Sequence, residues 1–235
     1  RPDFGCLFGA ALRSRPPPSS RRRPVRGGRP RRPRRGRDSE RPPRLGVPLR
    51  RGAEVPPTPE ELEAARHDAQ RDELTGLANR RKMDEFLDAM LTLFPEEKKP
   101  FSFIIADVDH FKHYNDTHGH QLGDVVLASV ASIFKNNIRR GDLAARFGGE
   151  EFVVILPNCK KDNAVQIGHK LRMAIAEEKI PFQEQQPMGN LTCALGVATF
   201  PEDADTKELL LKKADDCLYK GKAAGRNMVV AAERL

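Results

Sequence analysis

Two adjacent carboxylates beside a glycine pair are the residues of this sequence best suited to chemistry. Glu150 and Glu151 follow Gly148–Gly149, and apolar residues flank the segment at 143–145 and 153–156. This pattern predicts two short buried strands joined by a tight turn. Because neighbouring side chains of an extended segment point to opposite faces, we expect the two glutamates to have different roles. The bare glycine backbone favours a metal–phosphate site, and a solvated hairpin tip is the alternative.

A second acidic pair closes another apolar run. Asp107 and Asp109 follow Phe101–Ala106, whose composition predicts a central strand buried on both faces. A carboxylate at the end of such a strand can face a site, which makes Asp107 the second candidate for chemistry. Asp109 is either a further carboxylate of that site or a cap of the following loop, and we favour the cap.

These motifs, in this order, resemble the GGDEF family of diguanylate cyclases, here in a GGEEF form. The resemblance covers roughly residues 70–231 and rests on five segments, Asp72–Arg81, Asp107–Asp109, Phe111–Asp124, Arg146–Phe152 and Lys222–Asn227. It implies an α/β (α+β) fold, a ferredoxin-like palm of the nucleotidyl-cyclase type whose central sheet is flanked by helices. It also implies an enzyme that condenses two GTP molecules into cyclic di-GMP.

The resemblance assigns the metal ligands and the catalytic residues. It implies that Asp107, the main-chain carbonyl of Val108 and Glu150 hold Mg²⁺ or Mn²⁺. It implies that Glu151 supports the site through Lys112. Either Glu150 or a water is the base that takes the proton of the attacking 3′-hydroxyl.

The resemblance also assigns the contacts to GTP. For the phosphates it implies the backbone N–H groups of His110 and Phe111 together with the side chains of Lys222 and Arg226, which are four residues apart at an expected helix end. For guanine it implies Asn115 and Asp124, since a carboxylate accepts from both N1–H and N2–H₂, and it puts Leu77 in the base pocket. Taken alone, the two cations fit a solvated helix end, and Asn115 and Asp124 fit caps or turns.

An R-x-x-D pattern precedes the hairpin. Arg139 and Asp142 match the site at which cyclic di-GMP inhibits members of the family, and a planar guanidinium suits both phosphate and guanine. The alternative is an ordinary solvated turn. A further basic contact comes from the next helix, as either Lys170 or Arg172.

Charge divides the chain. Residues 1–55 hold 17 Arg, no Lys and four acidic residues, whereas 56–235 carry a net charge of −5. We therefore expect a disordered Arg/Pro-rich tail (1–55), a linker helix (56–71) capped by Thr58, and the cyclase domain (72–235). The tail is either a non-specific polyanion contact or an unstructured leader or gene-boundary artefact, and we favour the second.

Apolar spacing predicts the remaining elements. We expect helices from Asn79, after Asp124, over about 164–176 and over 209–219, with strands at 191–200 and 227–231. His110, His113, His118 and His120 are expected in a loop, and oxygen ligands nearby argue against a zinc site there.

The cysteines and the hydropathy indicate the compartment. Cys6, Cys159, Cys193 and Cys217 lack metal or disulfide spacing, which favours reduced thiols in the cytoplasm. No apolar run is long enough for a membrane span.

We therefore expect a homodimeric cyclase, because each protomer carries one GTP half-site. The first alternative is a catalytically silent GGDEF domain that acts as a receptor for GTP or cyclic di-GMP. The second, an arginine-rich RNA-binding protein with a vestigial domain, rests on the tail alone.

Overall fold

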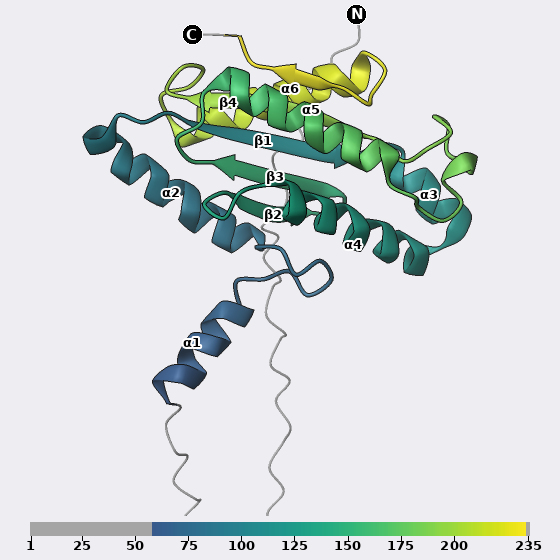
Figure 1. The fold of residues 1–235 in the computed structure, drawn as a ribbon, viewed down its shortest axis with the longest axis horizontal. Coiled ribbons are helices and arrows are strands. Elements are labelled where there is room, and N and C mark those ends of the chain that lie inside the picture. Colours follow the sequence, from purple (N-terminus) through teal and green to yellow (C-terminus); the bar gives the residue numbers. More distant parts are fainter. Residues whose placement is uncertain (1–57, 234–235) are drawn as a thin grey trace, which may run out of the picture. The chain divides into compact units, whose positions relative to one another are not determined.

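The computed structural model describes residues 58–233, and the predictions for the tail lie outside them. A five-stranded sheet in the order β2-β3-β1-β4-β5 forms the centre of this part of the chain (Figure 1). Its strands are β1 (Phe101–Val108), β2 (Leu143–Gly148), β3 (Glu151–Leu156), β4 (Cys193–Phe200) and β5 (Val229–Ala231). The helices are α1 (Pro59–Asp68), α2 (Arg80–Glu97), α3 (Phe111–His118), α4 (His120–Asn137), α5 (Lys161–Glu177) and α6 (Lys207–Ala223), with a 3₁₀ turn at Gln183–Gln185.

The central position of β1 follows from its composition. Every residue of β1 and of β4 is buried, as the unbroken apolar runs predict for strands covered on both faces. β1 pairs antiparallel with β3 and with β4, and β4 pairs parallel with β5. The predicted sheet flanked by helices is therefore confirmed.

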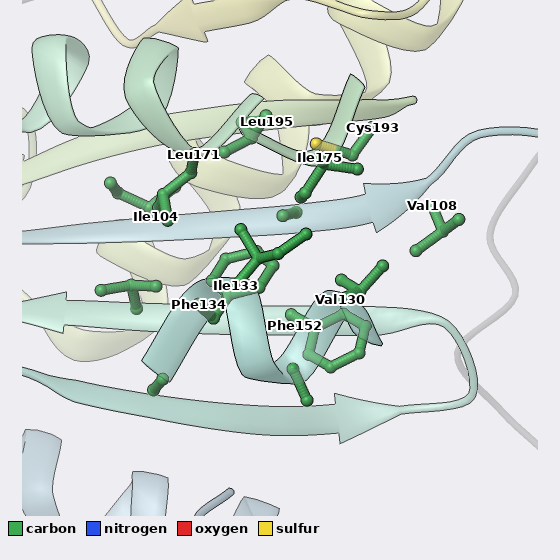
Figure 2. Packing of buried hydrophobic residues seen from close by; sticks show 14 of the residues in the cluster. Ile104, Val108, Val130, Ile133, Phe134, Phe152, Leu171, Ile175, Cys193 and Leu195 are labelled. Carbon is green, nitrogen blue, oxygen red and sulfur yellow. The ribbon is translucent and has the colours of Figure 1, made fainter. Parts of the chain in front are cut away.

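Alternate residues of β1 face two separate helical layers. Ile104, Ala106 and Val108 pack with α3, α4 and α5 in one core cluster. Figure 2 shows Ile104 and Val108 together with residues of α4 and α5. Phe103 and Ile105 pack with α2 and α6 in the other. The period of two is that of a strand, and each fully buried aliphatic or aromatic side chain contributes ~1.5–3 kcal/mol to folding. Asp107 consequently belongs to the face covered by α2 and α6.

The layer formed by α6 lies unusually close to the sheet. A Cβ atom at Gly196 of β4 would lie 2.0 Å from the carbonyl oxygen of Ala214 and 2.5 Å from the backbone nitrogen of Leu218. Both atoms belong to the α6 backbone, which cannot move aside as a side chain can. The absence of a side chain at Gly196 therefore sets the spacing between β4 and α6.

The starts of α1 and α2 agree with the sequence, whereas α4 begins at His120 and so includes Asp124, and α5 and α6 begin three and two residues earlier than expected. Thr58 and Glu61 form a reciprocal capping box at α1, with Oγ1 accepting from the Glu61 N–H at 3.2 Å and Glu61 accepting from the Thr58 N–H at 2.8 Å. The Asn79 side chain caps α2 by accepting from the N–H of Lys82.

One helix was not predicted. We expected the four histidines in a loop. Instead, His113 and His118 lie within α3, His120 begins α4, and only His110 lies outside a helix, directly before α3. Within residues 58–233, no cluster of three or more His, Cys, Asp or Glu side chains is arranged to hold a metal ion by itself.

Two further expectations can be compared with residues 58–233. Cys159, Cys193 and Cys217 are buried free thiols. None of the helices in this range is long and apolar enough to cross a bilayer.

Candidate active site

The Gly148–Gly149 turn joins β2 to β3 as predicted, and a guanidinium holds it in place. Arg146 donates from Nε and Nη2 to the carbonyl oxygen of Gly149, at 3.0 and 2.8 Å. Its Nη1 donates to both carboxylate oxygens of Asp72, each at 3.3 Å. One mostly buried arginine therefore fixes the backbone immediately before Glu150 against the loop that precedes α2.

The register of the sheet brings the acidic residues of the two motifs together. Asp107 of β1 lies directly opposite Glu151 of β3, so their side chains share the face covered by α2 and α6. The N–H of Val108 donates to the carbonyl oxygen of Glu150 at 3.3 Å, which places the Glu150 backbone beside the end of β1.

Two cations from the C-terminal part of the chain complete this end of the sheet. Nζ of Lys222, in the last turn of α6, lies 2.7 Å from Oδ2 of Asp107. Arg226 lies just beyond α6 with φ of 67°, and its N–H donates to the carbonyl of Gly221 at 3.0 Å. Burial raises the pKa of Asp107, and the charges of Lys222 and Arg226 oppose that rise. The predicted pair of phosphate-binding cations is thus close to the carboxylates.

Burial and mutual repulsion dominate the electrostatics. Burial raises the pKa of Asp107, and the attraction of Lys222 opposes this only in part. The pKa values of Glu150 and Glu151 are raised by burial first and by the Asp107 charge second. The three neighbouring carboxylates repel one another despite the nearby Lys222 and Arg226, and a bound cation would relieve this repulsion.

The oxygen donors present suit Mg²⁺ or Mn²⁺. A hard cation of this kind is commonly bound by one or two carboxylates together with ligand phosphates. Asp107, Glu150 and the carbonyl oxygen of Val108 offer such donors at one end of β1. The predicted ligand set therefore fits the chemistry of the site.

Asp109 links separate segments and does not cap the loop that follows it, while its Oδ1 is buried without a hydrogen-bond partner in the described part of the chain. Its Oδ2 accepts from Oγ1 of Thr192 at 2.7 Å and from the N–H of Asn227 at 2.9 Å. The carboxylate thus ties the end of β1 to the segments that precede β4 and β5. Because Asn227 follows Arg226, this contact also anchors the loop that carries one of the two cations.

Asn115 and Asp124 lie on neighbouring helices. Asn115 is on α3 and Asp124 in the first turns of α4, and a Cβ at Gly123 would lie 1.9 Å from Oδ1 of Asn115. The amide of Asn115 therefore touches the backbone next to Asp124. Its Oδ1 is buried without a hydrogen-bond partner in the described part of the chain, which leaves this oxygen able to accept from a water or a ligand.

The other predicted GTP contacts are placed less directly. His110 and Phe111 lie at the start of α3, where backbone N–H groups lack partners within the helix. Leu77 is 5% exposed and belongs to the core cluster that contains Phe111, so its contact with a base remains a prediction.

The structure does not bring Lys112 to Glu151. The charged groups that affect the pKa of Glu151 are Asp107, Lys222, Asp215 and Arg80, and the described residues include no ion pair of Lys112. The physical reason is the pleat: Glu151 faces α2 and α6, whereas α3 packs in the cluster on the opposite face. The supporting role of Lys112 remains a prediction.

The R-x-x-D residues form a compact pair beside a cavity. Arg139 donates from Nε to Oδ1 of Asp142 at 2.9 Å and from Nη2 to the carbonyl oxygen of Pro157. The pair lines a cavity of about 400 Å³ that Lys170 also lines. Arg172, the other candidate for the third contact, instead donates to Oδ1 of Asn227 at 2.8 Å. The geometry favours Lys170.

The comparisons agree with this arrangement. The family model described as the diguanylate cyclase GGDEF domain matches residues 69–228, and the chain belongs to this family. Response regulator PleD of Caulobacter vibrioides is 42% identical over 159 residues, which are 68% of this chain and 35% of PleD. Diguanylate cyclase DgcM of Escherichia coli is 37% identical over 174 residues, which are 74% of this chain and 40% of DgcM. The chain therefore spans little more than a third of the length of these relatives.

Solved structures show the same fold. The coiled coil and GGDEF domain of DgcB from Caulobacter crescentus, in complex with c-di-GMP, superimposes with a TM-score of 0.68 at 33% identity, covering 74% of this chain and 91% of that structure. The active GGEEF domain of a diguanylate cyclase from Vibrio cholerae has a TM-score of 0.62 at 31% identity, over 68% and 99% of the two chains.

Proposed function

We propose that this chain is a diguanylate cyclase, which joins two GTP molecules into cyclic di-GMP and releases two pyrophosphates. The observation that carries the proposal is the convergence of Asp107, Glu150, Lys222 and Arg226 at one end of the sheet. This places acidic metal ligands beside phosphate-binding cations, the combination that phosphoryl transfer requires. The names of the relatives support the same activity.

Asp107, Glu150 and the Val108 carbonyl would hold Mg²⁺ or Mn²⁺. The metal would supply a Lewis acid that neutralises charge on the α-phosphate and lowers the pKa of the 3′-hydroxyl. When GTP binds, Lys222 and Arg226 would contact its phosphates, so Lys222 must exchange Asp107 for the nucleotide. Asp124 and Asn115 would select guanine by accepting from and donating to its Watson–Crick edge.

Each half-reaction forms one bond and breaks one. The 3′-oxygen of one GTP attacks the α-phosphorus of the other, the bond to the pyrophosphate oxygen breaks, and the hydroxyl proton passes to Glu150 or to a water. Lys222 and Arg226 would stabilise the charge on the departing pyrophosphate. Because each chain would bind one GTP, two chains must face each other, and the active form would be a homodimer.

Product inhibition would use the cavity lined by Arg139, Asp142 and Lys170. Its volume is in the range that holds small ligands, and Arg139 and Asp142 offer a guanidinium and a carboxylate to the product. Cyclic di-GMP bound there would hold the two half-sites apart without occupying the GTP pocket.

The test is direct. The purified chain is incubated with GTP and MgCl₂, and the products are identified by mass spectrometry. Asp107→Asn and Glu150→Gln should each lower cyclic di-GMP formation by at least ~10²-fold, while Glu177→Gln, an exposed carboxylate on α5, should not. If wild type binds GTP or cyclic di-GMP but forms no product, the chain is a receptor instead.

Two further proposals concern the setting of the reaction. We place it in the cytoplasm, where GTP is available and where buried free thiols stay reduced. We assign residues 1–55 at most a non-specific contact with polyanions. Deleting them should remove salt-sensitive binding to heparin and leave the cyclase rate within about twofold.

A further inference from the structure

A second cavity, of about 510 Å³, opens at the edge of the sheet away from the carboxylates. It lies where the loop that precedes α2 leaves the β2 edge. That loop pairs with β2 through Ala78, whose N–H donates to the carbonyl of Ala144 at 3.2 Å. The C-terminal end of α4 and the turn before β2 form the remaining wall. The volume is that of a site for a small molecule.

The cavity is lined by cations. Arg71, Lys82, Lys135, Arg139 and Arg140 contribute to its walls, whereas Asp142 is the one acidic residue among those that line it. Arg139 is ion-paired with Asp142. Lys82, Lys135 and Arg140 make no ion pair with any residue in the range 58–233. Three like charges around one space repel one another, and a bound anion would relieve that repulsion.

Helix dipoles do not account for this arrangement. Lys135 is in the last turn of α4, where a cation stabilises the negative helix end and needs no ligand. Lys82, however, is in the first turn of α2, where the dipole disfavours a positive charge. Arg140 lies outside any helix. The three charges come from three different segments and share only the cavity.

The walls between the charges are apolar, and they include Leu77, Ile138 and Leu143. A ligand that matches them has one flat or apolar part and several negative charges. We propose that this cavity binds a small molecule bearing a polyphosphate group, either a nucleoside polyphosphate or a free polyphosphate. The charges of Lys82, Lys135 and Arg140 would face the phosphates, and the apolar wall would accommodate a base where one is present.

The proposed polyphosphate site overlaps each of the two proposed nucleotide sites only in part, because it shares Leu77 with the predicted base pocket and the Arg139–Asp142 pair with the product site. Lys222 and Arg226 do not line it. Arg139 and Asp142 line it together with the cavity that contains Lys170, so the two cavities lie on opposite sides of this ion pair. Lys135 and Arg140 line only the first, and Lys170 lines only the second, which provides matched variants.

The experiment is calorimetric titration of the full chain with sodium tripolyphosphate in EDTA, so that no metal-dependent binding contributes. Wild type should bind with an affinity that falls as NaCl is raised. The Lys135→Ala/Arg140→Ala double variant should bind at least about tenfold more weakly, since each lost contact to a charged group is worth about one decade. Lys170→Ala should bind tripolyphosphate as wild type does. The altered side chains are exposed, and thermal melting checks that the folds are intact.

Titration with ATP under the same conditions distinguishes a nucleoside polyphosphate from a free polyphosphate as the ligand. If ATP binds at least about tenfold more tightly than tripolyphosphate, and loses this affinity in the double variant, the ligand is a nucleotide. Equal affinities identify a free polyphosphate.

Absence of tripolyphosphate binding by wild type at ~1 mM, or equal binding by the double variant, overturns the proposal. Binding of cyclic di-GMP is measured in parallel: its loss in Lys170→Ala but not in the double variant tests the product site separately, and its absence in wild type leaves the polyphosphate site unaffected.

Discussion

Nζ of Lys222 and Oδ2 of Asp107 lie 2.7 Å apart, although 115 positions separate the two residues in the chain. The lysine therefore neutralises a carboxylate that we assign to the metal. On this assignment, a metal ion and Lys222 would compete for Asp107, and GTP would remove the competition by giving the lysine a phosphate partner.

Replacing Lys222 by Met should consequently have opposite effects on two ligands. Mn²⁺ should bind about tenfold more tightly in the absence of nucleotide, because one nearby positive charge is removed. GTP should bind roughly tenfold more weakly, because a charged contact to its phosphates is lost. Electron paramagnetic resonance of free Mn²⁺ measures the first effect and calorimetry the second. Weaker Mn²⁺ binding in the variant would show that Lys222 supports the metal site instead of competing for it.

The raised pKa of Glu150 predicts that Glu150→Gln stabilises the ligand-free domain. A carboxyl whose pKa is higher in the folded than in the unfolded protein favours folding while protonated, and this contribution is lost as the pH rises from 4.5 through the folded value. At pH 7 the variant should therefore melt about 2–4 °C above wild type, and the difference should vanish below pH 4.5. Calorimetric melting curves across this range provide the test.

Added Mg²⁺ should raise the melting temperature of wild type and not that of Glu150→Gln. Glu177→Gln serves as the control with an ordinary exposed carboxylate. A variant that melts at or below the wild-type temperature at pH 7 would contradict the assignment of repulsion to this cluster.

Selection of guanine over adenine should depend on Asp124 and on the contact between the amide of Asn115 and the backbone of Gly123. Asp124→Ser should lower the preference for GTP over ATP by roughly 5- to 150-fold, because the guanine donors lose their acceptor. Gly123→Ala should act in the same direction, since its Cβ would displace the amide of Asn115. Competition of the two nucleotides for cyclization, followed by mass spectrometry, gives the ratio. An unchanged ratio in both variants would mean that other residues read the base.

Substitutions of Lys170 and Arg172 should affect product inhibition and the rate of turnover differently. Lys170→Ala should raise the cyclic di-GMP concentration for half-inhibition by more than about tenfold and leave the initial rate nearly unchanged. Arg172→Ala should lower the rate, because it frees Asn227 beside the loop of Arg226, and leave the inhibition constant unchanged. Initial rates against added product measure both. The reverse pattern would assign the third contact to Arg172.

The sheet was predictable because short local sequence patterns specify its strands. The apolar run of β1 and the Gly148–Gly149 turn each need only a few neighbouring residues to be interpreted. Helix α3 was missed because it has eight mostly polar residues with just two buried positions, Phe111 and Tyr114. Its amphipathic signal is too short to stand out.

The motifs predict which residues form the candidate site, but they do not predict how those residues pair. The motifs identified Asp107, Glu150 and Lys222, but no local pattern indicates that Lys222 pairs with Asp107. The choice of Lys170 over Arg172 likewise depends on which side of α5 faces the cavity, because residues two apart on a helix point in different directions. The pairing of Lys222 with Asp107 and the side of α5 that faces the cavity are both set by tertiary packing.

The bare backbone at Gly196 has a consequence for variants found by genetic screening. Any side chain there must push α6 away from β4, and Lys222 is carried by the last turn of that helix. The altered position lies within the sheet and contacts neither the metal ligands nor the proposed nucleotide contacts. From its position alone, a substitution at Gly196 would be interpreted as a destabilised core. Its effect on the site, however, would be to displace the amine of Lys222 relative to the carboxylate of Asp107.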